Sequence, residues 1–164
     1  MYMNPFNRKV IEKLLRENDL VFSPLFTAKP HVFVSISNPL AAKEYVTPED
    51  LENYPCLSFE QGEYNSFYFS EEILSTTFSR KSIHVSDRAT IFNLMIGLNG
   101  YTISTGIVSA DLNGDHITAV PLCIDDVMEV GWIAHSAIKL TRQASMYLEE
   151  LKDVIAEYGV IVKD

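Results

Sequence analysis

Short runs of β-branched and aromatic residues alternate with stretches of helical apolar spacing, and this alternation constrains the fold most strongly. Strands are predicted at residues 20–26, 31–37, 56–59, 83–85, 101–104, 117–124 and 128–135. Helices are predicted at residues 5–18, from residue 47 onward, at 67–78, from residue 86 or 87 to 99, and at 136–158. This order is typical of an α/β sandwich with a largely parallel sheet.

Several helix ends carry their own local signals. Asn4 is a predicted N-cap with Pro5 at the first helical position, where the missing proline N–H has no cost. Thr47 and Asp50 have the spacing of a capping box. Gly159 follows the last predicted helix and is expected to terminate it.

Composition narrows the class of protein. The 164 residues are 47% apolar and 21% charged, which suits one globular domain or two small lobes. The net charge of -9 and the absence of a basic cluster indicate that this chain does not itself bind DNA. No apolar run reaches the ~18 residues of a membrane span, and the first ten residues lack the apolar core of a signal peptide. A cytoplasmic location is therefore expected.

Catalytic and metal-binding patterns are missing from the sequence. It contains no GxSxG, P-loop or GxGxxG motif, and neither His84 nor His135 has a nucleophile or metal ligand at a recognisable spacing. There is no CxxC or HxxxH, so no metal or other cofactor is expected. Cys56 and Cys123 have apolar sequence neighbours and are predicted to be buried, reduced thiols.

Two loops that lead from a strand into a helix form the candidate binding site, together with one polar turn. In an open α/β sheet such loops gather at the carboxyl ends of the strands, where ligands bind. The candidate residues in these three segments are Glu60, Gln61, Tyr64, Asn65, Ser66, Ser86, Asp87, Ser104 and Thr105. For each residue taken singly, ordinary helix capping is the competing interpretation, and for the set a polar ligand pocket is favoured.

The order of several segments resembles that of LysR-type transcriptional regulators. Residues 37–41, Ser-Asn-Pro-Leu-Ala, are similar to the family's His-Pro-Leu-Ala motif, with Asn38 at the histidine position. The other matching segments are residues 25–34, 46–51, 54–59, 96–105, 117–122 and 130–132. Thr105 stands where proline is common in the family.

The resemblance implies a type II periplasmic-binding-protein fold, in which two α/β lobes joined by two crossover strands hold an effector in the cleft between them. Lobe II is expected to be complete at residues 35–121, and lobe I partial at 1–34 and 122–164, as in a shortened family member. The crossovers are expected near residues 32–35 and 122–124. Carried over by position, Ser37 joins the effector-binding residues given above.

The resulting hypothesis is an effector-sensing domain that binds a small polar metabolite, forms a homo-oligomer, and acts on DNA only through a separate N-terminal helix-turn-helix domain. Three alternatives stay open: a solute-binding protein of the same fold, a small α/β enzyme, and a purely structural dimerisation module. The missing signal peptide disfavours the first, and the missing nucleophile–base pair disfavours the second.

Overall fold

The computed structural model describes residues 1–60 and 81–163, which fall into two compact units along the chain. Unit 1 comprises Met1–Ala28 with Asp126–Asp164, and unit 2 comprises Lys29–Asp125. The predicted helix at 67–78 lies outside the described residues. Within the described residues, no helix is both long enough and apolar enough to cross a bilayer.

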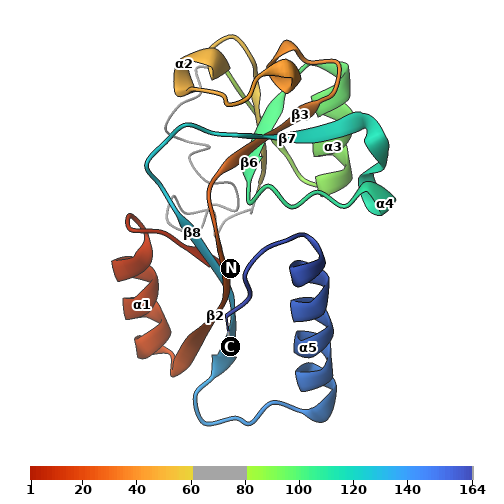
Figure 1. Ribbon diagram of the computed structural model, residues 1–164. Helices are drawn as coiled ribbons and strands as arrows, with labels where there is room; N and C mark the ends of the chain where they lie inside the picture. The colour runs from red at the N-terminus through yellow and green to blue at the C-terminus, as the bar shows by residue number, and fades with distance from the viewer. Residues whose placement is uncertain (61–80, 164) are drawn as a thin grey trace. The chain divides into compact units, whose positions relative to one another are not determined.

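Unit 1 is built on an antiparallel sheet of three strands in the order β1-β8-β2. Its elements are β1 (Tyr2–Met3), α1 (Arg8–Glu17), β2 (Leu20–Ala28), β8 (Met128–His135) and α5 (Arg142–Glu157). Figure 1 shows α1 and α5 on opposite sides of the β2–β8 pair. Near the chain end, Val162 bridges Phe26, and the Lys163 N–H donates to the Leu25 carbonyl at 2.6 Å. The last residues therefore pair with β2.

Helix α1 starts later than the sequence predicted. The Asn4 side-chain oxygen accepts hydrogen bonds from the Phe6 N–H at 3.1 Å and the Asn7 N–H at 2.9 Å. The Asn7 side chain in turn accepts from the Asn4 N–H at 2.8 Å. These bonds close a turn before the helix, because an asparagine side chain competes with the helical backbone bonds. Asn7, and not Asn4, is the N-cap residue.

Helix α5 also begins later, at Arg142 instead of Ser136. The Thr141 hydroxyl oxygen accepts from the Ala144 N–H at 3.2 Å, which fixes the start of the helix. The end agrees with the prediction: Gly159 has a positive φ of 73° and its N–H donates to the Ala156 carbonyl at 2.9 Å.

Unit 2 contains a mixed sheet of five strands in the order β5-β4-β6-β3-β7. Its strands are β3 (His31–Ser35), β4 (Cys56–Phe59), β5 (Ser82–Val85), β6 (Tyr101–Ser104) and β7 (Ile117–Pro121). Its helices and 3-10 turns are η1 (Pro39–Ala42), α2 (Pro48–Leu51), α3 (Arg88–Gly97), α4 (Ala110–Asn113) and η4 (Gly114–His116). Strand β4 runs parallel to β5 and β6, whereas β3 runs antiparallel to β6 and β7. The prediction of a largely parallel sheet is wrong.

Helix α3 covers one face of this sheet and forms the core of unit 2. Side chains from the sheet and the helix make one apolar cluster, whose buried members are Phe33, Leu57, Val85, Ile91, Met95 and Ile117. The capping box at Thr47 is confirmed: its N–H donates to the Asp50 carboxylate at 3.0 Å. These packed elements hold the ends of the strands in fixed positions, which matters for the candidate site.

The chain passes between the units at residues 28–29 and 125–126. Residues 32–35, near which one crossover was expected, lie in β3 inside the sheet of unit 2. Residues 122–124 also belong to unit 2, where the Cys123 N–H donates to the Val46 carbonyl at 2.8 Å. The assignment of residues 1–34 and 122–164 to lobe I and of 35–121 to lobe II stays a prediction.

The two cysteines differ in their surroundings. Cys56 is buried, as predicted, whereas Cys123 is exposed, so the second part of that prediction is wrong. Leu122 next to it is buried. Adjacent residues in an extended segment point to opposite sides, so apolar sequence neighbours did not ensure burial of Cys123.

Glycine at position 131 is required by the close approach of β2 to β8. A Cβ atom at Gly131 would lie 2.3 Å from the Ser23 carbonyl oxygen, and backbone cannot move aside cheaply. We expect Gly131→Ala to lower the free energy of unfolding by about 3 kcal/mol, at the upper end of typical overpacking costs. Urea denaturation followed by circular dichroism measures this change.

The matched control is Gly97→Ala in α3, where a Cβ atom would meet nothing within 4 Å. Alanine has the higher helix propensity, so this variant is expected to gain about 0.5 kcal/mol. Equal effects of the two substitutions would contradict the close β2–β8 packing.

A carboxylate on the central strand of unit 1 joins both ends of the chain. Glu129 accepts from the Lys163 ammonium at 2.5 Å and from the Arg8 guanidinium at 2.6 Å. These hydrogen bonds, first that of Lys163 and then that of Arg8, lower the pKa of Glu129 from its usual 4.5. The stabilisation is therefore present above about pH 4.5 and is lost as the pH falls through the lower, folded-state pKa.

We expect Glu129→Gln to reduce the loss of stability on acidification below about pH 4.5, because the group that titrates is removed. Urea midpoints measured between pH 7 and pH 3 test this expectation. Glu12→Gln is the control, since Glu12 is more exposed and its carboxylate lies 3.5 Å from Arg8. A wild-type pH profile in Glu129→Gln would contradict the proposed role of the ion pairs.

Candidate functional site

The parallel strands of unit 2 bring three of the predicted segments to one edge of the sheet. Phe59 pairs with Val85 at the ends of β4 and β5, and Cys56 pairs with Tyr101 at the starts of β4 and β6. Glu60, Ser86 and Thr105 directly follow the three strands. Because parallel strands end at the same edge, these residues lie along it, and we call it the carboxyl edge.

Glu60 is held at this edge by its backbone. Its N–H donates to the Val85 carbonyl at 2.8 Å, and its side chain is exposed. Ser86, directly after Val85, is also exposed. A carboxylate and a hydroxyl group are thus presented to solvent where β4 and β5 end.

Asp87 caps helix α3 in the way that the competing interpretation of the sequence proposed. Its carboxylate accepts from the Thr90 N–H at 3.0 Å and is also hydrogen-bonded to the Thr90 hydroxyl. The Thr90 hydroxyl and then the Thr90 N–H lower the pKa of Asp87, so the carboxylate is ionised at neutral pH. A contact between Asp87 and an effector stays a prediction.

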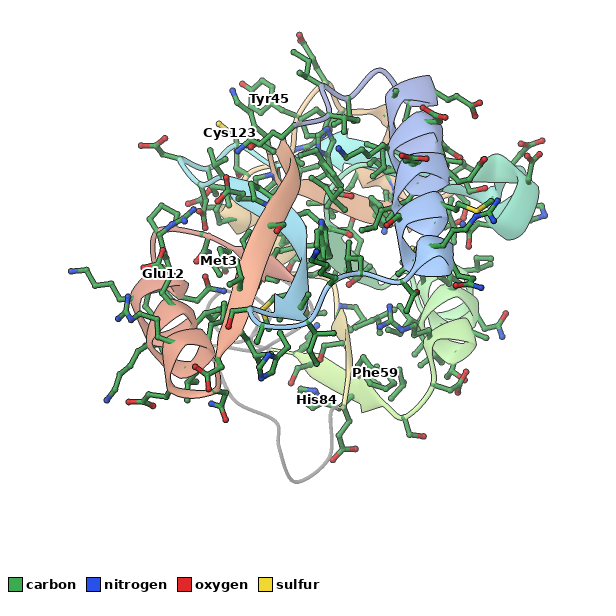
Figure 2. The ribbon with its side chains drawn as sticks, turned by 90° about the horizontal axis from the view of Figure 1, so that it is seen from below. Met3, Glu12, Tyr45, Phe59, His84 and Cys123 are labelled. Atoms are coloured by element: carbon green, nitrogen blue, oxygen red, sulfur yellow. The ribbon has the colours of Figure 1, made fainter. Side chains whose placement is uncertain are left out.

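Next to Asp87, an arginine covers an aromatic ring at the same edge. The guanidinium carbon of Arg88 lies 5.6 Å from the centroid of the Phe59 ring, within the range of a cation–π contact. Figure 2 shows Phe59 on the side of β4 that faces α3, with His84 on the other side. The edge therefore carries a cationic group as well as the carboxylates of Glu60 and Asp87.

The turn after β6 packs against a histidine that the sequence did not single out. Ser104 pairs with His31 across the antiparallel β3–β6 ladder, so His31 also lies at the carboxyl edge. Thr105 accepts from the Ile107 N–H at 3.4 Å. A Cβ atom at Gly106, where φ is +91°, would lie 2.7 Å from His31 Nδ1. No local sequence signal links residue 31 to residue 104; the strand pairing does.

Ser37 does not join the other candidates. Strand β3 runs antiparallel to β6, so the residues after β3 lie beyond the opposite edge of the sheet from Ser104. Ser37 is exposed and its hydroxyl lies 2.9 Å from that of Ser35. The expectation that Ser37 lies with the other candidates is wrong. Four further candidates, Gln61, Tyr64, Asn65 and Ser66, lie outside the described residues.

One pair of side chains has the spacing of a nucleophile and its base. The Ser58 hydroxyl lies 2.8 Å from His84 Nδ1, so the expectation that His84 has no such partner is wrong. Ser58 is only 3% exposed in the middle of the sheet, which keeps a substrate from reaching its oxygen. The pair is best explained as a cross-strand hydrogen bond between β4 and β5.

Metal ligation has no support in the part of the chain that the structure describes. There, no group of three or more His, Cys, Asp or Glu side chains is arranged so that it could hold a metal ion. The groups at the carboxyl edge are instead suited to hydrogen bonding with a polar organic molecule.

Comparison with known proteins identifies the family. The family model described as "LysR substrate binding domain" matches residues 10–156. The chain belongs to this family. It is an effector-binding domain of the LysR type, with the type II periplasmic-binding-protein-like fold. No curated protein sequence matches it.

Solved structures of LysR-family domains are similar in fold. The regulatory domain of NMB2055 (MetR) from N. meningitidis has a TM-score of 0.62 at 13% identity, covering 90% of this chain and 72% of that one. The C-terminal domain of a probable LysR regulator from Rhodococcus sp. RHA1 has a TM-score of 0.57 at 17% identity, covering 81% and 67%. The effector binding domain of QuiR, in complex with shikimate, has a TM-score of 0.55 at 15% identity, covering 94% and 79%.

Some matched LysR-family chains are considerably longer than this one. One example is a putative LysR-family regulator from Pseudomonas aeruginosa, with a TM-score of 0.55 at 14% identity. The match covers 90% of this chain and 57% of that one. This chain therefore corresponds to the effector-binding domain of such a regulator and spans only part of its length.

The capping role of Asp87 gives a test that separates structure from ligand binding. Asp87→Ala removes the oxygen that accepts from the Thr90 N–H and is expected to lower the urea midpoint. Asp87→Asn keeps a capping oxygen and is expected to keep the midpoint near that of the wild type. If asparagine destabilised the domain as much as alanine, the carboxylate charge and not the cap would be the stabilising feature.

Proposed function

We propose that this chain senses a small polar metabolite and that the carboxyl edge of unit 2 contributes its binding residues. The single observation that supports the proposal is the convergence of three chain segments at this edge, after β4, β5 and β6. The proposed contacts among the described residues are Glu60, Ser86, Ser104 and Thr105, with Asp87 as a further candidate. Gln61, Tyr64, Asn65 and Ser66 follow Glu60 in the sequence and remain part of the proposal.

The groups at the edge favour a ligand with several hydrogen-bonding groups. Hydroxyls of Ser86, Ser104 and Thr105 both donate and accept, so they suit hydroxyl, carboxyl or amino groups of a metabolite. The QuiR domain, which has a similar fold, was solved with shikimate, a carboxylic acid that carries hydroxyl groups. We therefore propose a hydroxylated or amino-substituted organic acid as the class of effector.

Signalling would follow from linked equilibria. We propose that a separate N-terminal helix-turn-helix domain binds DNA, because this chain has 13 basic against 22 acidic residues and a net charge of -9, whereas phosphate binding depends on an excess of Lys and Arg. An effector changes DNA binding only to the extent that its affinity differs between two conformations of the protein. In this proposal the lobes are residues 1–34 with 122–164 and residues 35–121.

Self-association is the other part of the proposal. Helix α5 has only one buried residue, Ile155, and its Tyr147 and Met146 side chains are 67% and 53% exposed. A second copy of the chain would remove this apolar surface from water. We propose a homo-oligomer that is located in the cytoplasm and has no enzymatic activity, since the Ser58 hydroxyl is too deeply buried to act on a substrate.

A bulky side chain at the turn after β6 tests the binding site. Thr105 is only partly buried, so Thr105→Trp is expected to fold with a Tm within a few degrees of the wild type while it fills the space at the edge. The measurement is a thermal-shift screen of the wild type with the twenty protein amino acids and shikimate. For every compound that raises the wild-type Tm, Thr105→Trp should lower the affinity at least tenfold.

Ser37→Trp is the matched control, because Ser37 is exposed and lies beyond the opposite edge of the same sheet. It should leave binding unchanged. Wild-type affinity in Thr105→Trp, or an equal loss of affinity in both variants, would show that the effector does not bind at the carboxyl edge. A solute-binding protein of this fold is the alternative, and it would bind a ligand without any effect on an attached DNA-binding domain.

A further inference from the structure

We propose that His31 is a specificity-determining residue of the effector site, and that its Nε2 atom accepts a hydrogen bond from a hydroxyl or ammonium group of the effector. This inference rests on the proposed function of the carboxyl edge. It adds to that function a residue which no sequence motif indicated, and a definite chemical group that the effector must carry.

The first observation is the position of His31 in the sheet. His31 is the first residue of β3 and pairs with Ser104, the last residue of β6. Paired residues on neighbouring strands point to the same face of a sheet. The imidazole of His31 therefore lies beside the Ser104 hydroxyl, at the edge where β4 and β5 also end.

The second observation is that one ring nitrogen is already engaged. His31 Nδ1 lies 2.9 Å from the Lys29 carbonyl oxygen. A carbonyl oxygen can only accept, so Nδ1 must carry the proton in this contact. In the neutral ring Nε2 then has no proton and is a hydrogen-bond acceptor.

The third observation is that the ring is held in place. Gly106 approaches it so closely that a Cβ atom would lie 2.7 Å from Nδ1, 2.8 Å from Cγ and 2.9 Å from Cε1. The positive φ of Gly106, +91°, is a backbone conformation that glycine adopts without strain. The Thr105–Gly106 turn thus packs directly on the imidazole, and the ring has little freedom to turn away.

These observations give His31 a defined recognition property. Across the described residues no partner of Nε2 is found, while Nδ1 is bonded to the backbone. An acceptor that is fixed in orientation discriminates between ligands that offer a donor at that point and ligands that do not, since an unmatched polar group loses its hydrogen bond to water. The effector is therefore expected to place an O–H or N–H group against His31.

Two substitutions separate the two ring nitrogens. The amide nitrogen of His31→Asn can replace Nδ1–H as the donor to Lys29, but the side chain has nothing at the position of Nε2. His31→Gln reaches the position of Nε2 with an amide that can accept, but it loses the contact to Lys29. If His31 matters only for its contact with Lys29, asparagine should preserve effector binding. If Nε2 binds the effector, glutamine should preserve it.

The experiment uses the compounds that raise the wild-type Tm among the twenty amino acids and shikimate. Calorimetric titration should show at least a tenfold weaker affinity for His31→Asn and less than a threefold change for His31→Gln. Analogues of each binding compound, each with a single O–H or N–H group methylated, should include one that binds wild type at least tenfold more weakly because it lacks the donor to His31. For that analogue, the methylation should change affinity for His31→Asn less than threefold.

Wild-type affinity in His31→Asn, combined with loss of binding in Thr105→Trp, would overturn the role of His31 while leaving the proposed function intact. Loss of binding in His31→Asn and His31→Gln to the same extent would overturn it as well, because that pattern indicates a structural role.

A measurement without any ligand tests the inference independently of the proposed function. Nitrogen-15 NMR of the histidine rings, recorded as a pH series, should show that the neutral form of the His31 ring carries its proton on Nδ1 and none on Nε2. A proton on Nε2 in the neutral ring would overturn the inference. If none of the compounds binds wild type, the proposed effector class is wrong. The NMR measurement then tests by itself whether Nε2 of His31 is a hydrogen-bond acceptor.

Discussion

The antiparallel pairing of β3 with β6 determines which residues of unit 2 share an edge of the sheet. Because the two strands run in opposite directions, the start of β3 at His31 lies beside the end of β6 at Ser104. The end of β3 and the following Ser37 are carried to the other edge. The same strand also pairs with β7 along its full length, so its position is fixed from both sides. The membership of the candidate site follows from this one pairing.

Features that depend on neighbouring residues could be predicted from the sequence, because their physics is local. The capping box at Thr47, the cap at Asp87 and the left-handed Gly159 are each made within a few residues of chain. The direction of β3 could not be predicted, because it depends on pairing between residues that are about seventy positions apart. The same limit explains the mistaken placement of Ser37 and the unexpected presence of His31.

Two smaller expectations were wrong, one because of a contact across strands and one because of competing local hydrogen bonds. His84 has no candidate partner within its own segment, and its hydrogen bond to Ser58 exists only because β4 and β5 pair in register. The helix before β2 was expected to start at Pro5, but the bonds between Asn4 and Asn7 close a turn first. Sequence patterns indicate which residues can make such bonds; the backbone path decides which of the possible bonds form.

The unequal construction of the two units has a consequence for the order in which they can fold. All of unit 2 lies between residues 29 and 125, whereas unit 1 needs residues from both ends of the chain. Its Glu129 carboxylate binds Arg8 near the start and Lys163 near the end. During synthesis on the ribosome the whole of unit 2 emerges while β2 still lacks its partner β8. Unit 2 can therefore be complete first, and the sheet of unit 1 closes only after β8 and the residues that follow it have been made.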